Sequence, residues 1–175
     1  MNTFKDATTE EINVIMEQSW GAFETYRTFS LQQRAGFMHA IATALGSISD
    51  AVVAAAMKET HLPEARLNNE LTRTIFQLNS YADACKQGNW IEARIDTAIT
   101  ERNPSKPDLR KMLVPLGPVV VFGASNFPFA YSTAGGDTAC ALAAGCPVIV
   151  KAHPAHAQTS QMVSDAIIKV ARECN

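Results

Sequence analysis

The sequence predicts an α/β protein in which N-terminal helices precede a projecting antiparallel ribbon and the first β-α-β-α units of a parallel sheet. Apolar residues recur at a period near 3.6 through the first half of the chain, which indicates amphipathic helices. The period changes to 2 over Ile91–Thr100, as in a strand with one buried face. Two continuous apolar runs, Val119–Phe122 and Val148–Val150, then flank a segment of small residues, which is typical of parallel strands.

The first two helices are predicted from their apolar stripes and their start signals. Thr9 is followed by two glutamates, which make an acidic first turn. Ser30 and Gln33 form a capping-box pattern, in which each side chain binds the other residue's backbone amide. We expect both stripes, Trp20 included, to lie in the core. The stripe positions are Ile12, Ile15, Met16, Ser19, Trp20 and Phe23 in the first helix, and Ala35, Met38, Ala42 and Leu45 in the second.

A third and a fourth helix are separated by a break at His61–Pro63. The third is expected to begin near Ser49 or Asp50. Pro63 opens the fourth at its first turn, where its missing N–H is harmless, and Gly88 ends it. The inward positions are Val52, Val53, Ala56 and Met57 in the third helix, and Leu67, Leu71, Ile75, Leu78, Ala82 and Cys85 in the fourth.

A projecting ribbon is predicted within residues 90–114. Residues alternate between the two faces of a strand over Ile91–Thr100. Residues 103–107 contain two prolines and form a loop, after which Leu109–Val114 returns as a second strand. Two strands alone are marginally stable in water, so we expect the ribbon to lie against another segment or subunit.

The last third of the chain follows a strand, helix, strand, helix order. Phe129–Ala144 is predicted to be a helix of small residues that Gly145 closes, and a last helix follows Pro154. Because both strands are continuously apolar, we expect the sheet to be covered on both faces, and its open edge to be paired with further polypeptide. The chain then divides into residues 1–89, a helical part; residues 90–114, the ribbon; and residues 115–175, the start of the sheet.

The composition excludes several classes of function. The 175 residues are 47% apolar and 18% charged with a net charge of -2, which indicates a soluble chain without a basic surface for nucleic acid or anionic lipid. The start lacks a secretory signal, and no apolar stretch approaches the roughly 20 residues that cross a bilayer, so we expect a cytoplasmic protein.

The cysteines lack metal-ligand or disulfide spacing, which fits a reducing compartment. We expect them to be small core residues: Cys85, Cys140, Cys146 and Cys174.

Small and polar residues follow the two predicted parallel strands. Gly123–Asn126 follows the first strand and Lys151 ends the second. Ligands of such sheets bind outside the carboxyl ends of the strands, where small residues allow close approach. The usual glycine-rich dinucleotide fingerprint is absent, so these residues alone support cofactor binding only weakly. Taken alone, Asn126 is better explained as a helix cap or turn residue, and Lys151 as a solvated strand end.

Two strand-end motifs resemble the aldehyde dehydrogenase family. That family carries an asparagine before Phe-Pro, and this chain has the similar segment GASNFP at Gly123–Pro128. The family's lysine-bearing strand resembles VIVKAH at Val148–His153. Residues 22–35, ETHLPEAR and ERNPSKPDLR are also similar, so the resemblance runs from about residue 20 to the end. The branch with ketoglutarate semialdehyde (2,5-dioxopentanoate) dehydrogenases and NADP-linked fatty aldehyde dehydrogenases is closest, which implies an incomplete aldehyde dehydrogenase fold with a Rossmann-like sheet.

The resemblance implies roles for the strand-end residues. Asn126 is expected to donate its side-chain amide to the substrate oxygen while a thiol adds to the aldehyde, because negative charge grows on that oxygen. Lys151 is expected to bind the adenosine ribose hydroxyls or a 2'-phosphate. NAD-preferring members often carry a glutamate three residues after this lysine, and its replacement by Pro154 favours NADP over NAD. The expected cofactor groove also includes Phe122, Gly123, Ala124, Ser125 and His153, with His156 either assisting phosphate binding or serving as an ordinary loop residue.

The resemblance also implies a reaction that this chain does not complete by itself. In the family, a cysteine thiolate attacks the aldehyde, hydride passes to nicotinamide and a glutamate activates water. The motifs for both groups lie downstream of these residues, and neither Cys140 nor Cys146 has the nucleophile's context. The isolated chain is therefore expected to be inactive, with the catalytic domain absent from it.

The implied partners are an aldehyde and further copies of the protein. Ketoglutarate semialdehyde is the leading substrate and a fatty aldehyde the second. The complete protein is expected to be a dimer or tetramer joined through residues 90–114, with no metal, nucleic acid or membrane partner. The alternatives are a non-catalytic oligomerisation or nucleotide-binding module and a flavodoxin-like domain.

Overall fold

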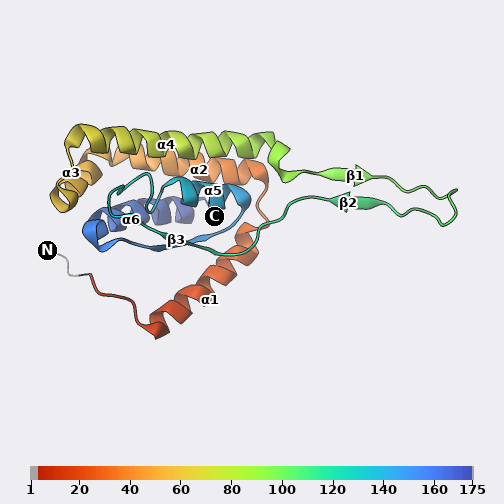
Figure 1. The fold of residues 1–175 in the computed structure, drawn as a ribbon, viewed down its shortest axis with the longest axis horizontal. Coiled ribbons are helices and arrows are strands. Elements are labelled where there is room, and N and C mark those ends of the chain that lie inside the picture. Colours follow the sequence, from red (N-terminus) through yellow and green to blue (C-terminus); the bar gives the residue numbers. More distant parts are fainter. Residues whose placement is uncertain (1–3, 175) are drawn as a thin grey trace.

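The computed structural model of the protein describes residues 4–174. Within this range, helices form the N-terminal half, an antiparallel ribbon extends away from the body, and a parallel strand pair with its helices completes the chain (Figure 1). This arrangement confirms the predicted fold class. The elements are α1 Thr9–Tyr26, α2 Leu31–Ser47, α3 Ser49–Thr60, α4 Glu64–Gln87, η1 Asn89–Ile91, β1 Arg94–Asp96, β2 Leu109–Lys111, β3 Val119–Phe122, α5 Gly136–Ala144, β4 Val148–Lys151, η2 Pro154–His156 and α6 Ala157–Glu173.

Capping side chains fix the starts of the first two helices. Ser30 Oγ accepts the Gln33 amide at 3.2 Å, and Gln33 Oε1 accepts the Ser30 amide at 2.9 Å, which confirms the predicted capping box of α2. Thr8 and Glu11 form the same box for α1. Pro63 has extended backbone angles and stands just before α4, whereas it was predicted to lie in the first turn.

The core lies between α2 and α4 and extends to α3, α5 and α6. Several of its largest fully buried side chains come from the predicted apolar faces, namely Met38, Leu45, Val52, Leu67, Leu78 and Cys85. In the described part of the chain, no single helix has the length and hydropathy to span a membrane. Only α2 and α3 taken together, with a 70° bend between them, meet that test by length and composition.

The apolar stripe of α1 is largely exposed, contrary to the prediction. Trp20 is 54% exposed, whereas Phe23 is buried. Helix α1 diverges from the body toward its N-terminal end, so only its last turns reach the other elements (Figure 1). The exposed apolar residues of this helix are Ile12, Val14, Ile15, Met16 and Trp20.

The ribbon is antiparallel as predicted, but its strands are shorter. Strand β1 pairs with β2 so that Ile95 lies opposite Arg110. The first strand starts late because Asn89–Ile91 forms a 3-10 turn and Glu92 adopts a left-handed φ of 50°. Ile95 is 70% exposed and the ribbon extends away from the body (Figure 1). No other segment within residues 4–174 covers the ribbon, so neither of its faces is buried there, and its predicted packing against another subunit stays a prediction.

The parallel sheet matches its prediction at the strands but not at the helix between them. Strands β3 and β4 pair in parallel from Val119 to Phe122, which lies opposite Lys151. Val121 is the only buried residue of these two strands, and the others are partly or fully exposed, because the sheet has no third strand in the described chain. Helix α5 begins at Gly136, so the first half of the predicted helix Phe129–Ala144 is wrong and consists of turns.

Contacts from distant residues hold the segment before α5 in turns. The amides of Phe129 and Ala130 donate to Glu70 Oε1 at 2.8 and 2.9 Å. The Gly136 amide donates to Ala130 O at 3.1 Å. Gly135 packs so closely against the same oxygen that a Cβ added at this position would lie 2.3 Å from it. A composition of small residues is compatible with a helix, but these contacts favour the turn.

Buried side chains satisfy the last carbonyls of α5. Tyr26 Oη donates to Leu142 O at 2.9 Å, and Cys85 Sγ donates to Ala143 O at 3.3 Å. Burial raises the pKa of the Tyr26 phenol and of the Cys85 thiol, while the nearby Arg34 guanidinium lowers both. Both groups therefore remain protonated donors at neutral pH.

The thiols divide into two buried and two exposed groups, which corrects the expectation that all four lie in the core. We expect a thiol reagent near neutral pH to label Cys140 and Cys174 rapidly, and Cys85 and Cys146 only after denaturation, because burial keeps the latter out of solvent. Peptide mass spectrometry identifies the labelled positions. The double variant Cys140→Ser, Cys174→Ser is the control, and rapid labelling of that variant would contradict the assignment.

Candidate functional site

The carboxyl ends of β3 and β4 meet at one edge of the sheet. Phe122 lies opposite Lys151, and the Gly123 amide donates to Lys151 O at 3.0 Å. Phe122 is 72% exposed, and the exposed Lys151 ammonium makes no hydrogen bond or ion pair within residues 4–174. A Cβ at Gly123 would lie 3.2 Å from Ser132 Oγ and 3.3 Å from the His153 amide nitrogen, so crowding inside the protein favours glycine there. This edge thus presents an aromatic ring beside an ammonium group.

Asn126 lies in the turn that follows β3, next to the exposed Ser125. The Ala124 amide donates to Tyr131 O at 2.8 Å, which closes the turn, and Arg66 Nη2 donates to the Asn126 carbonyl at 2.7 Å. The Asn126 side chain is exposed and hydrogen-bonds to nothing in the described chain. It caps no helix, because α5 begins only at position 136. Its amide is therefore available to a ligand.

Two arginines of α4 contact the aromatic residues of this turn. The Arg66 guanidinium lies 5.2 Å from the Phe127 ring centroid, and the Arg73 guanidinium lies 5.5 Å from that of Tyr131. Arg73 Nη2 also donates to Tyr131 Oη at 3.1 Å. Phe127 and Tyr131 meet edge to face with centroids 5.1 Å apart. Phe127 and Tyr131 stand before and after the two backbone amides that bind Glu70, so the arginines hold the turn against α4 on both sides of those amides.

Helix α4 contributes side chains to the site that were not predicted from the sequence. Arg66, Glu70 and Arg73 are spaced by four and three residues, so they lie on one helical face. That spacing could have been read from the sequence, since charged residues at these positions stand beside the apolar positions Leu67 and Leu71. Their target, however, is more than fifty residues away in the chain, and no local pattern identifies it.

His156 ties the loop after β4 to the turn after β3. Its ring is fully buried, with Nε2 2.7 Å from Ala124 O and Nδ1 3.2 Å from Ser160 Oγ. His156 is therefore an internal link and offers no surface to a phosphate. His153 is half-buried and its Nδ1 accepts a backbone amide at 3.1 Å, while Pro154 is exposed at the start of η2.

A side chain already binds the N-terminus of α6. Glu59 of α3 accepts the amides of Gln158 and Thr159 at 2.8 Å each and the Thr159 hydroxyl at 2.7 Å. Helix N-termini bind anions through such amides. Because Glu59 takes them, a phosphate at this edge of the sheet would meet side chains instead of the helix end.

Comparison with known proteins identifies the family. The model of the aldehyde dehydrogenase family matches residues 1–173, almost the whole chain. The chain belongs to the aldehyde dehydrogenase family.

Two curated aldehyde dehydrogenases are close relatives over their N-terminal portion. Alpha-ketoglutaric semialdehyde dehydrogenase 2 of Azospirillum brasilense is 50% identical over 165 residues, which cover 94% of this chain and 31% of the relative. Alpha-ketoglutaric semialdehyde dehydrogenase of Acinetobacter baylyi is 44% identical over 167 residues, which cover 95% of this chain and 32% of the relative. The chain thus spans about a third of the curated aldehyde dehydrogenases that it matches.

Solved aldehyde dehydrogenases share the fold. Succinic semialdehyde dehydrogenase of Streptococcus pyogenes, in complex with NADP+, matches with a TM-score of 0.77 and 15% identity over 98% of this chain and 36% of that one. Betaine aldehyde dehydrogenase of Staphylococcus aureus matches with a TM-score of 0.82 and 18% identity over 97% and 32%. The NAD-dependent benzaldehyde dehydrogenase of Corynebacterium glutamicum matches with a TM-score of 0.79 and 20% identity over 95% and 34%.

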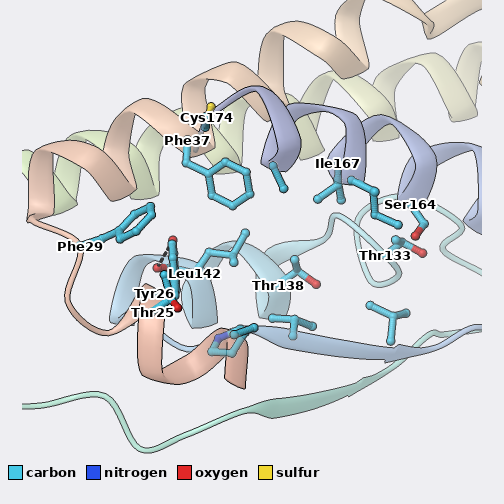
Figure 2. A pocket seen from close by; sticks show the side chains of 16 residues that line it. Thr25, Tyr26, Phe29, Phe37, Thr133, Thr138, Leu142, Ser164, Ile167 and Cys174 are labelled. Atoms are coloured by element: carbon cyan, nitrogen blue, oxygen red, sulfur yellow. Dashed lines mark hydrogen bonds between the residues drawn. The ribbon is translucent and has the colours of Figure 1, made fainter. Parts of the chain in front are cut away.

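Of two cavities in this aldehyde dehydrogenase chain, one contains no predicted site residue and the other contains only Phe122. A pocket of about 640 Å³ lies between α1, α2, α5, β4 and α6, and Phe29, Phe37 and Ile167 are among its apolar lining residues (Figure 2). A second cavity of about 590 Å³ includes Phe122 but no other predicted site residue. Neither cavity is lined by Asn126 or Lys151, so we place the candidate site at the strand ends. Among the residues described, no cluster of three or more metal-ligating side chains forms.

Proposed function

We propose that this chain supplies the cofactor-binding and oxyanion-binding groups of an aldehyde dehydrogenase that oxidises an aldehyde to a carboxylic acid. The proposal rests on one observation: the parallel register sets Lys151 beside Phe122, and the chain runs from Phe122 directly into the Asn126 turn. An ammonium group and an unpaired amide donor therefore lie at the same edge of the sheet. Family membership supports the reading of this edge as a cofactor and substrate site.

The groups at the strand ends fit an NAD(P) cofactor. The exposed Phe122 ring offers a flat apolar surface, and the Lys151 ammonium can donate to ribose hydroxyls or to a phosphate. The bound nicotinamide supplies the acceptor for the hydride that leaves the aldehyde carbon. The remaining contribution of the chain is to orient the cofactor through the backbone of Gly123–Ser125 and through His153 and Pro154.

Asn126 is the proposed oxyanion donor. When a thiolate adds to an aldehyde, the carbonyl π electrons move to oxygen and a negative charge develops there. A side-chain amide that is held in place and has no partner inside the protein can donate to that oxygen without first breaking another bond. The Arg66 contact to the Asn126 carbonyl restrains the residue without occupying its side chain. We assign the nucleophile to none of the four cysteines of this chain.

NADP is the proposed cofactor and ketoglutarate semialdehyde the proposed substrate. The segment Lys151–His156 contains no carboxylate, so a 2'-phosphate would meet no repulsion from it. Pro154 takes the position where a ribose-binding glutamate is expected in NAD-preferring members. The substrate proposal follows the names of the two curated relatives, which are both alpha-ketoglutaric semialdehyde dehydrogenases.

Replacing Lys151 with methionine tests the cofactor assignment in the complete gene product. We expect Lys151→Met to weaken NADP binding about 10- to 100-fold, because a charge-assisted hydrogen bond is lost, and NAD binding by much less. Fluorescence titration with each nucleotide measures both, and Lys151→Arg, which keeps the charge, is the matched control. Equal losses for NAD and NADP would place the lysine on the ribose hydroxyls, and unchanged affinities for both would remove Lys151 from the site.

A non-catalytic oligomerisation module is the second candidate function, and the ribbon favours it. Both of its strands are exposed, with apolar side chains such as Ile95 and Leu109 in solvent. A second copy could cover such a ribbon. Sedimentation of the chain with and without NADP separates the candidates: a monomer that binds the nucleotide contradicts the module, and an oligomer that binds none supports it.

A further inference from the structure

Glu70 is a buried carboxylate on the apolar side of α4. Its side chain is only 6% exposed and stands beside the buried residues Leu67 and Leu71. Oε1 accepts two backbone amides, whereas Oε2 is buried without a hydrogen-bond partner among the residues described. Burial of an ionisable side chain is unfavourable unless hydrogen bonds compensate for the lost hydration. The two amides are therefore the contacts that explain a glutamate at this position.

The amides that Glu70 binds belong to the turn that carries Asn126. Pro128 has no N–H, so the amides of Phe129 and Ala130 are the first ones after it that an acceptor can hold. On the other side of Asn126, the Ala124 carbonyl is bound by His156. The turn is thus anchored before and after Asn126, and Glu70 is its downstream anchor.

Two arginines of α4 flank Glu70. Arg66 precedes it by four residues and Arg73 follows it by three, so both guanidinium groups lie on the same helical face. Both arginines also contact the turn, through Asn126 O, Phe127 and Tyr131. Arg66, Glu70 and Arg73 therefore all contact the turn from α4, with the Glu70 carboxylate between the two arginines in the helix sequence.

We propose that Glu70 is a positioning residue, which orients the Asn126 amide toward the substrate oxygen by holding the Phe129 and Ala130 amides. The inference rests on the proposed function, because it assigns Glu70 a role through Asn126. Without the Glu70 carboxylate, the backbone N–H groups of Phe129 and Ala130 lose their acceptor, and the turn can change its conformation. The Asn126 side chain then samples orientations that do not reach the oxyanion. A misplacement of about 1 Å in such a site can cost about 100-fold in rate.

A double-mutant cycle in the complete gene product tests the role. We expect Glu70→Ala to lower kcat about 10- to 100-fold with little change in KM for the aldehyde, since the oxyanion bond forms only in the transition state. In an Asn126→Ala background, Glu70→Ala is expected to cause no further loss, because the group it positions is gone. Glu70→Gln should restore most of the activity, because one amide oxygen can accept both N–H groups as Oε1 does. Glu70→Met, which keeps the side-chain volume, replaces the alanine variant in the cycle if that variant does not fold.

Glu59→Ala is the matched control, because it also removes a partly buried carboxylate that accepts backbone amides. Glu59 also accepts two consecutive backbone amides, but at α6, and it makes no hydrogen bond or ion pair to the Asn126 turn within residues 4–174. Any effect of this variant on kcat is expected to multiply with that of Asn126→Ala. If the kcat losses of Glu70→Ala and Asn126→Ala also multiplied in the double variant, Glu70 would not act through Asn126. That result would overturn the positioning role and leave the proposed function intact. A normal kcat in Asn126→Ala would overturn the proposed function and, with it, the catalytic part of this inference.

Amide hydrogen exchange on the 175-residue chain provides a readout that needs no activity. We expect Glu70→Met to raise the exchange rates of Phe129 and Ala130 at least 10-fold, with those of the α2 core unchanged. Glu70→Gln should leave them close to those of the unsubstituted chain. Unchanged exchange at both amides in Glu70→Met would show that Glu70 does not hold the turn.

Discussion

Replacing Asn126 with alanine is expected to lower kcat for aldehyde oxidation by the complete gene product about 100- to 1000-fold. The side chain is exposed and has no hydrogen-bond partner within residues 4–174, so its removal disturbs no internal contact. The loss therefore falls on the transition state, where the developing oxyanion would lack its donor. Steady-state kinetics with ketoglutarate semialdehyde and NADP measures the effect.

A matched asparagine on α4 provides the control for this substitution. Asn69 is exposed and its side chain makes no hydrogen bond within residues 4–174, so Asn69→Ala should retain kcat and KM. Thermal melting of both variants should match that of the unsubstituted protein, because neither side chain supports the core. If Asn126→Ala kept its kcat, or raised only KM, Asn126 would be a turn residue without a role in oxyanion binding.

Replacing Gly135 with alanine is expected to reduce the free energy of unfolding by about 3 kcal/mol. The added Cβ would lie 2.3 Å from Ala130 O and 2.7 Å from its carbonyl carbon. These backbone atoms cannot move freely, because Ala130 O accepts the Gly136 amide and the Ala130 amide is bound by Glu70. Urea denaturation followed by circular dichroism measures the change.

Gly36 supplies the opposite case on an exposed side of α2. A Cβ there would meet nothing within 4 Å, and the residue lies inside a helix. Gly36→Ala should therefore stabilise the protein by about 0.5 to 1 kcal/mol through helix propensity alone. If Gly135→Ala were as benign as Gly36→Ala, the segment before α5 would not be the tight turn described above.

Local sequence signals predicted those features whose cause is local. The capping box of Ser30 and Gln33 starts α2, and Gly88 ends α4 in the left-handed conformation that only glycine adopts without strain. The two apolar runs became β3 and β4 in parallel register, because continuous apolar strands are the pattern of a parallel sheet. Each cap depends on residues within a few positions of one another, and each strand is marked by its own apolar run.

The remaining features depend on residues far apart in the chain. Small residues before α5 favour a helix locally, but the Glu70 carboxylate and the packing of Gly135 impose turns. The fully buried His156 looked like a surface histidine beside a proline, because its partner, Ala124 O, is 32 positions away. Similarly, the apolar stripe of α1 predicts a helix but does not tell which surface covers it, and in this chain Trp20 remains exposed.

The carboxylate of Glu59 at the start of α6 affects how the proposed cofactor site would attract a dinucleotide. The positive end of that helix is bound by a carboxylate of the chain itself, so long-range attraction of an anion would depend on exposed side-chain charges such as those of Lys151 and Arg66. Such attraction decays over a Debye length of about 8 Å at physiological ionic strength. Encounter of the nucleotide with the proposed site is therefore expected to slow as salt is added.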